Sequence, residues 1–404
     1  MNTLAPGYAQ AAYPDIVQTP AHPSFAFALA HLHGHAASDH ARTRPRVLDI
    51  GCNRGAQLRW IARTLPGATC LGLDALPAAI DEARAADNPK NLAFELGDLT
   101  TWDPGARRFD LIIAYGMLSW LPDPAREALL RLVARALAPG GIALICWIAL
   151  PGGAATEALG QLLRLEQARL PDIDAPAGSI GRGPAEALRR LAAGMVPALA
   201  GPSMAGALHV TQGKTPGGLT ADELHPDRRA FYLMEVLDAA TQSGLAYMGD
   251  AGLGLDWIAG GPSALAPALD GLPHLVALQY RDYLLHVGFR RSLFVRAQDA
   301  GRLQTEVNPV AALSLHAALI APSTRRIRAL TDPPGEDSDA LLAAIRAADQ
   351  TAPLRTVVAR ADLPARKDTA RWGIAALRLA ANNLIALSIG PPPPPDMADR
   401  PIPE

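Results

Sequence analysis

The stretch Asp49-Ile-Gly-Cys-Asn-Arg-Gly55 decides the fold of this chain. It ends a short apolar run, residues 46–50, of the length expected for one buried strand, and a helical pattern of apolar residues follows it. A loop between a parallel strand and its helix must turn sharply, and Gly51 and Gly55 permit that turn. Such a loop lies at the carboxyl edge of an open α/β sheet, where these folds bind ligands. We therefore predict a ligand site at residues 49–55.

Strands and helices alternate on both sides of this loop. The periodicity predicts further strands at 69–74, 92–96, 110–114 and 142–150, and helices at 58–65, 77–86 and 123–137. This alternation predicts an α/β fold, a Rossmann-like doubly wound parallel sheet. The chain after residue 153 is different, because its segments are rich in Ala and Leu at helical spacing. We expect a mainly helical second region there, with one strand at 292–296.

The composition is that of a globular protein. Of the 404 residues, 49% are hydrophobic and 19% are charged, and the net charge is −2 with basic residues spread along the chain. Nucleic-acid binding needs a concentrated positive face, so we expect no nucleic-acid partner.

No apolar run reaches the ~18 residues of a membrane helix, and the N-terminus lacks the pattern of a signal peptide, so we expect no membrane partner. The three cysteines are too few for a disulfide framework, which favours a cytoplasmic protein.

The changes of pattern along the chain predict six segments. They are an N-terminal cap segment at 1–43, a cofactor-binding domain at 44–153, a helical connector at 154–210, a substrate-docking domain at 211–335, a C-terminal helical region at 336–390 and a proline-rich tail at 391–404. A helix is expected at 184–199 within the connector.

Two acidic residues strengthen the prediction of a ligand site. Asp74 ends the second strand, where its carboxylate can accept hydrogen bonds from both hydroxyls of a ribose. Asp98 follows the third strand, where it and the backbone amide of Leu99 can bracket the edge of an adenine. Each acid alone is more often a helix cap or a solvated turn residue. Together with Gly51 and Gly55, whose spacing differs from the G-x-G-x-x-G of dinucleotide enzymes, they predict a nucleoside site.

These features resemble the class I methyltransferases. The order is a strand, D-x-G-x-x-x-G, an acid at the second strand end, G-D after the third strand, F-D-L-I-I at 109–113 and L-A-P-G-G at 137–141. The resemblance covers residues 44–150 and implies S-adenosylmethionine as the cofactor. It implies that Asp49, Gly51, Cys52 and Gly55 bind the methionine end, that Asp74 binds the ribose, and that Asp98 and Leu99 bind the adenine. It also implies that Tyr115 lies near the sulfonium.

A closer resemblance extends over most of the chain. Tyr13-Pro14, residues 18–23 and Y-G-M-L-S-W-L-P at 115–122 resemble bacterial methyltransferases that carry a methyltransferase regulatory domain, and residues 231–247 and 280–293 resemble that domain. The group includes protein-lysine N-methyltransferases. The chain departs from the group after its fifth strand, where Y-N-T-Y-P-G-W becomes Trp147-Ile-Ala-Leu-Pro-Gly-Gly153, and at His286-Val287, which replaces an N-R pair. These departures bear on the acceptor more than on the cofactor.

Methyl transfer from a sulfonium is an in-line displacement, in which the protein chiefly positions the reactants and excludes water. An acceptor lysine must first lose a proton, because its ordinary pKa is near ~10.4. The residues expected near the methyl group are Tyr115, Ser119 and Trp120, and Trp120 can equally be a packing residue. The sequence identifies no general base. In residues 210–390 we see no cluster of acids, histidines or cysteines that looks catalytic, so we expect this half to dock the acceptor.

Three functions are compatible with these patterns. The first is methylation of a protein side chain, with lysine nitrogen as the acceptor. The second is O- or N-methylation of a small molecule, and the third is a non-catalytic scaffold that binds S-adenosylmethionine. Only three of the 37 basic residues are lysine, at positions 90, 214 and 367, which fits either a GC-rich genome or a lysine-modifying enzyme that avoids its own modification. The oligomeric state does not follow from the sequence.

Four histidines gather near the N-terminus, at positions 31, 33, 35 and 40. Their spacing matches no standard zinc site, so we expect a solvated segment and no metal.

Overall fold

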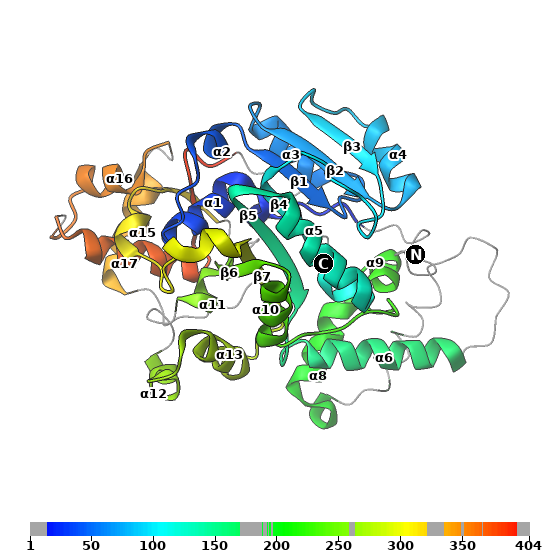
Figure 1. The fold of residues 1–404 in the computed structure, drawn as a ribbon. Coiled ribbons are helices and arrows are strands. Elements are labelled where there is room, and N and C mark those ends of the chain that lie inside the picture. The colour runs from blue at the N-terminus through cyan, green and yellow to red at the C-terminus, as the bar shows by residue number, and fades with distance from the viewer. Residues whose placement is uncertain are drawn as a thin grey trace.

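The computed structural model describes residues 14–169, 188, 192, 194, 197–257, 263–320, 335–348, 351–365 and 367–393. Its centre is a seven-stranded sheet in the order β3-β2-β1-β4-β5-β7-β6 (Figure 1). The strands are β1 Arg46–Ile50, β2 Thr69–Asp74, β3 Leu92–Leu96, β4 Phe109–Ala114, β5 Leu137–Ile148, β6 Leu245–Asp250 and β7 Phe289–Arg296. Strands β1 to β5 pair in parallel, and β7 pairs antiparallel with both β5 and β6. The predicted Rossmann-like fold is confirmed.

The last two strands come from the second half of the chain. Strand β7 pairs with β5 from Ala143↔Phe294 to Ile148↔Phe289, and it contains the strand predicted at 292–296. Strand β6, which the sequence analysis did not predict, closes the sheet beside β7. The sheet therefore continues across the expected domain limit at residue 153, and the two halves of the chain share one core.

Helices cover both faces of this sheet. Successive side chains of a strand point to opposite faces, so Leu111 packs on one face and Ile112 on the other. The face of Leu111 is covered by α1 Pro23–Leu32, α3 Ala56–Thr64 and α4 Pro77–Ala85. The opposite face is covered by α5 Asp123–Ala136, α10 Leu233–Gln242 and α13 His274–Leu285. Because both faces are covered, the central strands read as continuous apolar runs.

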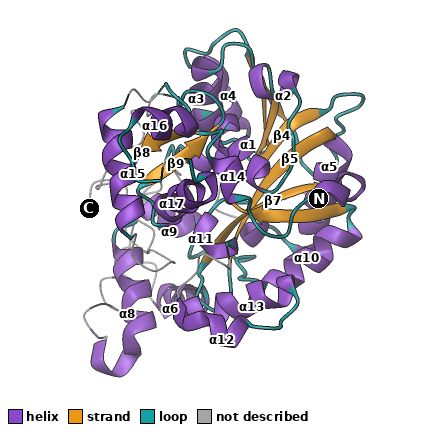
Figure 2. Ribbon diagram, turned by 90° about the vertical axis from the view of Figure 1, so that its left-hand side faces the viewer, coloured by secondary structure: helices purple, strands orange, loops and turns teal. Residues whose placement is uncertain are grey.

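The C-terminal region packs against the N-terminal helix. It comprises α14 Pro309–Ala312, β8 His316–Leu319, α15 Glu336–Ala347, α16 Leu354–Arg360, α17 Thr369–Ala381 and β9 Ile385–Ser388. Strands β8 and β9 form a separate antiparallel pair beside these helices (Figure 2). The backbone amide of Ile389 donates to the carbonyl of Ser24, and Trp372 of α17 is fully buried in the same core as Phe27 of α1. The two ends of the described chain therefore stabilise each other.

A further group of helices lies near the carboxyl ends of the parallel strands. It comprises α6 Ala154–Arg169, α8 Pro197–Gln212, which is kinked at Gly201, and α9 Pro216–Ala221. The remaining short elements are η2 Thr19–Ala21, α2 Asp39–Thr43, η3 Leu118–Trp120, α11 Leu253–Asp256, η5 Ser263–Leu265, α12 Ala266–Leu269 and η6 Ala297–Arg302. The predictions for Tyr13, for most of the helix at 184–199 and for residues 394–404 lie outside the described residues.

The expectation of a solvated histidine segment is wrong for His33 and His35, whereas His40 is exposed. His33 and His35 are buried, and each contacts a distant backbone carbonyl, of Gln304 and Gly140 respectively. His31 lies 2.8 Å from the Ser314 hydroxyl. His33 and His35 are buried because segments far away in the sequence pack over them, which the local sequence does not reveal. Within the described residues, no group of histidine, cysteine and acidic side chains is arranged to hold a metal ion.

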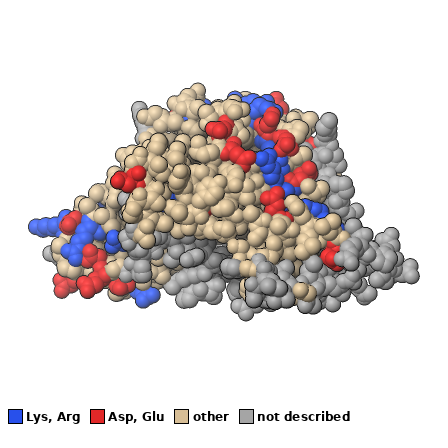
Figure 3. Space-filling view, turned by 90° about the horizontal axis from the view of Figure 1, so that it is seen from below, with Lys and Arg blue, Asp and Glu red and all other residues tan. Residues whose placement is uncertain are grey.

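In the view from below, uncharged side chains cover the centre of the surface (Figure 3). Lys and Arg side chains on this face stand beside Asp and Glu side chains at its edges. Across the part of the chain that the structure describes, no helix combines the length and the apolar character that crossing a membrane requires.

A buried histidine caps the N-terminus of α1. The His22 Nδ1 atom accepts from the Ser24 backbone amide, so the proton of the neutral ring lies on Nε2, 2.9 Å from the Thr64 hydroxyl. The Thr64 hydroxyl donates to the Trp60 carbonyl, which leaves its oxygen free to accept from Nε2. Burial lowers the pKa of His22 from 6.5 to about 3, because a charged ring there would lose its hydration.

Replacing His22 with Asn tests this arrangement, because Asn also caps helices but does not titrate. The folded protein binds fewer protons than the unfolded chain between pH 6.5 and 3, so the wild type loses stability as the pH falls through that range. We expect the free energy of unfolding, measured by urea titration, to fall more steeply with decreasing pH in wild type than in His22→Asn. The two slopes should differ by up to about 1.4 kcal/mol per pH unit. Exposed His40→Asn is the matched control. Equal pH dependence in wild type and His22→Asn would contradict the buried neutral cap.

Candidate active site

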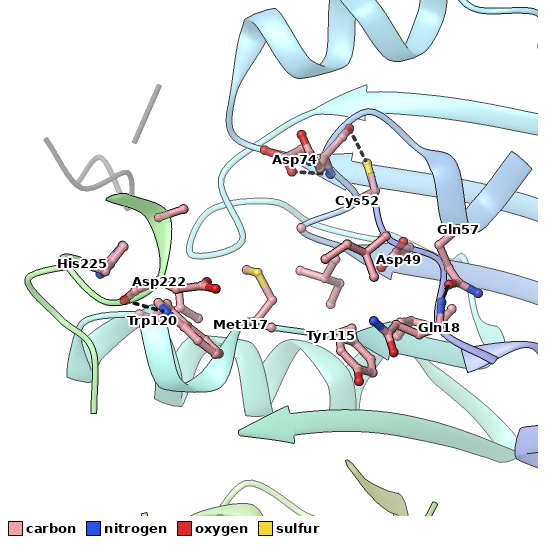
Figure 4. Close-up of a pocket in the computed structure, with 18 of the residues that line it drawn as sticks. Gln18, Asp49, Cys52, Gln57, Asp74, Tyr115, Met117, Trp120, Asp222 and His225 are labelled. Carbon is pink, nitrogen blue, oxygen red and sulfur yellow. Dashed lines mark hydrogen bonds between the residues drawn. The ribbon is translucent and has the colours of Figure 1, made fainter. Parts of the chain in front are cut away.

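A cavity of about 410 Å³ opens at the carboxyl ends of β1, β2 and β4. This volume is within the range of small-molecule sites. The structure brings seven of the predicted site residues to its wall: Asp49, Gly51, Cys52, Asp74, Leu99, Tyr115 and Trp120. The predicted residues Gly55, Asp98 and Ser119 are not part of the wall. Figure 4 shows the cavity running from Gln57 and Asp49 past Asp74 and Met117 to Trp120 and Asp222.

The glycine loop adopts a backbone conformation that favours glycine. Gly51 and Gly55 have φ angles of 76° and 78°, in the left-handed region. A Cβ atom at Gly51 would collide with the Met117 sulfur, and one at Gly55 with the Phe94 ring. The backbone amides of Gly51 and Cys52 both donate to the carbonyl of Leu73, which joins the loop to the end of β2. Gly55 therefore lets the loop pack closely against the Phe94 ring, while Gly51 forms part of the cavity wall.

Asp74 joins the loops that follow β1 and β2. Its Oδ2 accepts from the Asn53 amide at 2.8 Å, and its Oδ1 accepts from the Leu76 amide at 2.9 Å. Burial raises the pKa of this carboxyl, and the backbone amides of Leu76 and Asn53 oppose that shift. Each carboxylate oxygen can accept a second hydrogen bond. Asp74 can therefore receive hydroxyl donors from a ligand while it holds both loops.

Asp49 is the most strongly perturbed carboxyl of the cavity. Burial, followed by repulsion from Asp74, raises its pKa from 3.8 to about 8. Its side chain has no hydrogen-bond partner among the described residues, although the residue is only 5% exposed. A buried carboxyl without a partner favours a cationic ligand, whose charge would stabilise the ionised form.

Gln57 of α3 supplies a donor that the sequence analysis missed. Its Oε1 accepts from the backbone amide of Gln18 at 2.7 Å, which fixes the orientation of the amide group. Its Nε2 is buried at the cavity wall and has no partner within the described residues. Asp49 and Gln57 thus offer an acceptor and a donor at one end of the cavity (Figure 4). This pair matches the ammonium and carboxylate groups of an amino acid.

Asp98 is not part of the cavity wall, although the residues on either side of it are. Leu99 and Gly97 form part of the wall, whereas Asp98 Oδ1 accepts from the Thr100 amide at 2.9 Å and from the Thr100 hydroxyl at 2.7 Å. The Asp98 carboxylate therefore holds its own turn, and the residues on either side of it face the cavity.

Tyr115 follows β4 and is held by the second half of the chain. Its hydroxyl oxygen accepts from Arg291 Nε of β7 at 2.9 Å, and its ring lies 6.1 Å from that of Phe289. Burial raises the pKa of Tyr115 to about 12, so the phenol stays protonated. The hydroxyl points away from Asp49 (Figure 4). Tyr115 can thus shape the wall and donate a hydrogen bond, but it is poorly suited to accept a proton.

Ser119 and Trp120 have different surroundings. Ser119 is fully buried, and its hydroxyl oxygen accepts from the Ile148 amide at 2.8 Å, which connects η3 to the end of β5. Trp120 lines the cavity, and its Nε1 donates to the backbone carbonyl of Asp222 at 3.3 Å. Trp120 therefore links the methyltransferase-like segment 115–122 to a loop of the second half.

That loop brings a charged cluster to the far end of the cavity. Lys214 Nζ lies 2.8 Å from Asp222 Oδ2 and 2.7 Å from Glu223 Oε1. Buried His225 and Arg228 line the same end, and Arg228 Nη2 donates to the Thr156 hydroxyl at 3.0 Å. The sequence analysis saw no such cluster in residues 210–390, whereas the structure places two acids and a histidine of this region at the cavity. The available signal was Ala221-Asp-Glu-Leu-His225, with two acids and a histidine within five residues.

Two segments of the chain match known families. Residues 47–141 match the family described as "Methyltransferase domain", and residues 218–296 match the family described as "Predicted methyltransferase regulatory domain". The second match contains β6, β7, Asp222, Glu223 and His225, so the regulatory domain completes both the sheet and the cavity.

Individual relatives cover different shares of the chain. Uncharacterized protein RP789 of Rickettsia prowazekii is 27% identical over 70% of this chain, which spans 50% of that protein. Trans-aconitate 2-methyltransferase of Methylobacterium radiotolerans is 44% identical over 24% of this chain and 36% of its own length. The chain thus spans half or less of these curated relatives.

A solved structure matches the fold more completely. The structure of PKMT2 from Rickettsia typhi in complex with AdoHcy superposes with a TM-score of 0.73, covering 93% of this chain and 77% of that one at 17% identity. At this identity the likeness is one of fold. The chain thus contains a methyltransferase domain at residues 47–141, followed at residues 218–296 by a match to the methyltransferase regulatory domain, and it shares the fold of PKMT2.

Proposed function

We propose that the protein transfers a methyl group from S-adenosylmethionine to the amine nitrogen of a protein lysine. One observation carries the proposal: a single cavity joins the Asp49–Asp74 end to a second end where Asp222 and Glu223 already hold an ammonium group. The resemblance to bacterial methyltransferases that include protein-lysine enzymes supports the same acceptor.

The residues of the first end fit the cofactor group by group. Asp49 is an unpaired acceptor for the methionine ammonium, and Gln57 Nε2 is an unpaired donor for the methionine carboxylate. Asp74 keeps acceptor capacity for the ribose hydroxyls, and Leu99 gives an apolar wall for the adenine. When bound, S-adenosylmethionine supplies a methyl group that is already activated as part of a sulfonium. The protein is left to position the acceptor and to exclude water.

The second end fits an amine acceptor. Two carboxylates there can bind an ammonium group, and the Trp120 hydrogen bond to Asp222 fixes their distance from the methyltransferase segment. Phe289 and Tyr115 are part of the cavity wall, and Met117 lies between the two ends (Figure 4). An acceptor nitrogen in this position would be close to the cofactor and shielded from water.

A small-molecule acceptor is the second candidate. It is favoured by the 44% identity with a trans-aconitate 2-methyltransferase, although that identity covers only 24% of this chain. A substrate rich in carboxylates would need cations along the cavity. Here Lys214 is already paired with two acids, and Asp49 and Asp74 line the other end. These four acids favour a cationic acceptor, although Arg228 also lines the second end.

Transfer of radiolabel from S-adenosylmethionine into a cell lysate tests the proposal. We expect label in the protein fraction, and acid hydrolysis should release it as methylated lysine. Label confined to small metabolites would favour the second candidate. Absence of any transfer by protein that binds S-adenosylmethionine would indicate a scaffold.

Substituting Ala for Asp74 should weaken S-adenosylmethionine binding at least about tenfold, because hydrogen bonds to a charged group contribute about 1.5–3 kcal/mol each. Isothermal titration calorimetry measures the change. The matched control is Asp87→Ala, which removes a fully exposed carboxylate after α4. Wild-type affinity in a folded Asp74→Ala protein would contradict the ribose assignment.

Asp49 should make cofactor binding depend on pH. In the free protein its carboxyl is protonated below about pH 8, and a bound cation favours the ionised form. Binding then releases a proton, so affinity should increase by up to about tenfold per pH unit as the pH rises toward 8 and should level off above it. Calorimetry from pH 6 to 9 compares wild type with Asp49→Asn. Groups of the ligand titrate equally in both experiments, so identical pH profiles would exclude Asp49 as the cation partner.

A further inference from the structure

The charged cluster of Lys214, Asp222, Glu223 and Arg228 is more buried than a surface ion pair. Glu223 is 3% exposed at its side chain and Asp222 is 18% exposed, whereas Lys214 is 28% exposed. Glu223 Oε2 and Arg228 Nε are buried and have no hydrogen-bond partner within the described residues. Burying carboxylates is costly unless they are paired, and part of this cluster remains unsatisfied. The cluster can therefore form further hydrogen bonds with a ligand.

Neighbouring side chains hold the backbone that carries the two acids. Arg164 Nη1 donates to the backbone carbonyls of Glu223 and His225, and Trp120 Nε1 donates to that of Asp222. Lys214 lies in the loop between α8 and α9. Its flexible four-carbon side chain can turn toward solvent without disturbing the backbone of the acids. The Lys214 side chain can therefore leave the two carboxylates without moving the backbone that carries them.

We propose that Asp222 and Glu223 bind the primary ammonium group of the acceptor, that Glu223 takes its proton, and that Lys214 occupies this position until the acceptor displaces it. The inference rests on the proposed methyl transfer and specifies its acceptor site. The Lys214 side chain ends in a primary ammonium group, the same chemical group as that of the acceptor. Its contacts with Asp222 and Glu223 therefore illustrate how these two acids would bind the acceptor. Lys214 must leave because two ammonium groups beside the cofactor sulfonium would leave this end of the cavity with excess positive charge.

The ionisation of the cluster is consistent with these roles. Burial raises the pKa of Glu223, with Lys214 acting in the opposite direction, so this carboxylate accepts protons more readily than an exposed one. Burial alone would lower the pKa of Lys214, but the adjacent acids outweigh it and raise that pKa. In the free protein, which lacks the cofactor sulfonium, Lys214 therefore stays protonated. The cationic sulfonium would lower the pKa of an acceptor ammonium bound in its place, so that Glu223 can take the acceptor proton.

The acceptor ammonium gives one proton to Glu223, and the freed nitrogen electron pair forms a bond to the methyl carbon. The bond between that carbon and sulfur breaks, its electron pair stays on sulfur, and the sulfonium becomes a neutral thioether. The product nitrogen is a secondary ammonium, and Glu223 later releases its proton to water.

Lys214→Met, which removes the resident charge while keeping much of the volume, tests the binding site, and Lys214→Gln is a second variant. The probe is n-butylammonium, which has the length of a lysine side chain, and n-butanol is the uncharged control. We expect butylammonium to raise the Tm of either variant by about 2 °C or more and to shift the wild type less. Adding Glu223→Gln to Lys214→Met should remove the stabilisation.

Catalysis separates an acceptor site from a structural ion pair. With S-adenosylmethionine, Lys214→Met should convert butylamine to N-methylbutylamine, detected by mass spectrometry. Lys214→Met/Glu223→Gln should lose this activity near pH 7 and recover it toward pH ~10.4, where the amine is free of its proton in solution. A merely structural role would not produce that recovery.

The outcomes distinguish the two proposals. If the variants bind S-adenosylmethionine and label lysate protein, yet butylammonium neither stabilises them nor is methylated, the acceptor site is wrong and the proposed function stands. Stabilisation without methylation in such a protein also overturns the acceptor site. No labelling of any fraction by wild type contradicts the proposed function itself. Label in protein indicates that a protein lysine supplies the ammonium group, and label in small amines indicates that a small molecule supplies it.

Discussion

The pairing of β5 with β7 is the constraint on which the rest of the structure depends. Six residue pairs join a strand of the first half to a strand more than a hundred positions later. A shift of this pairing by one residue would move every β7 side chain to the opposite face of the sheet. Arg291 would then leave Tyr115, and Phe289 would leave the cavity wall. The register of one antiparallel pair thus sets the shape of the site.

A buried ion pair holds that register. Arg290 of β7 is fully buried, and its Nε and Nη2 contact the two carboxylate oxygens of Asp282 in α13 at 2.9 and 2.7 Å. Arg290 also lies 3.5 Å from Asp250 at the end of β6. Such pairs contribute little net stability, but a displaced strand would leave charges buried and unpaired. This cost favours one register of β7 over its neighbours.

The site therefore belongs to both family segments. Asp49, Asp74 and Tyr115 come from the methyltransferase segment, and Asp222, Glu223 and Phe289 come from the regulatory segment. The regulatory segment contributes strands, cavity wall and charge, so its role is structural and chemical at the same time. Trp120 connects the two contributions through its hydrogen bond to Asp222.

The sequence by itself determined the features that depend on local patterns. The strand–loop–helix order, the positive-φ glycines and the acids at successive strand ends are each set within a few residues, and they predicted the sheet type and the Asp49–Asp74 end of the cavity. Tertiary structure decided what depends on distant partners. It added β6 and β7 to the sheet, directed the Ser119 hydroxyl to Ile148, and brought Gln57 and Glu223 to the cavity. No local pattern specifies these contacts, because they arise when segments far apart in the chain pack together.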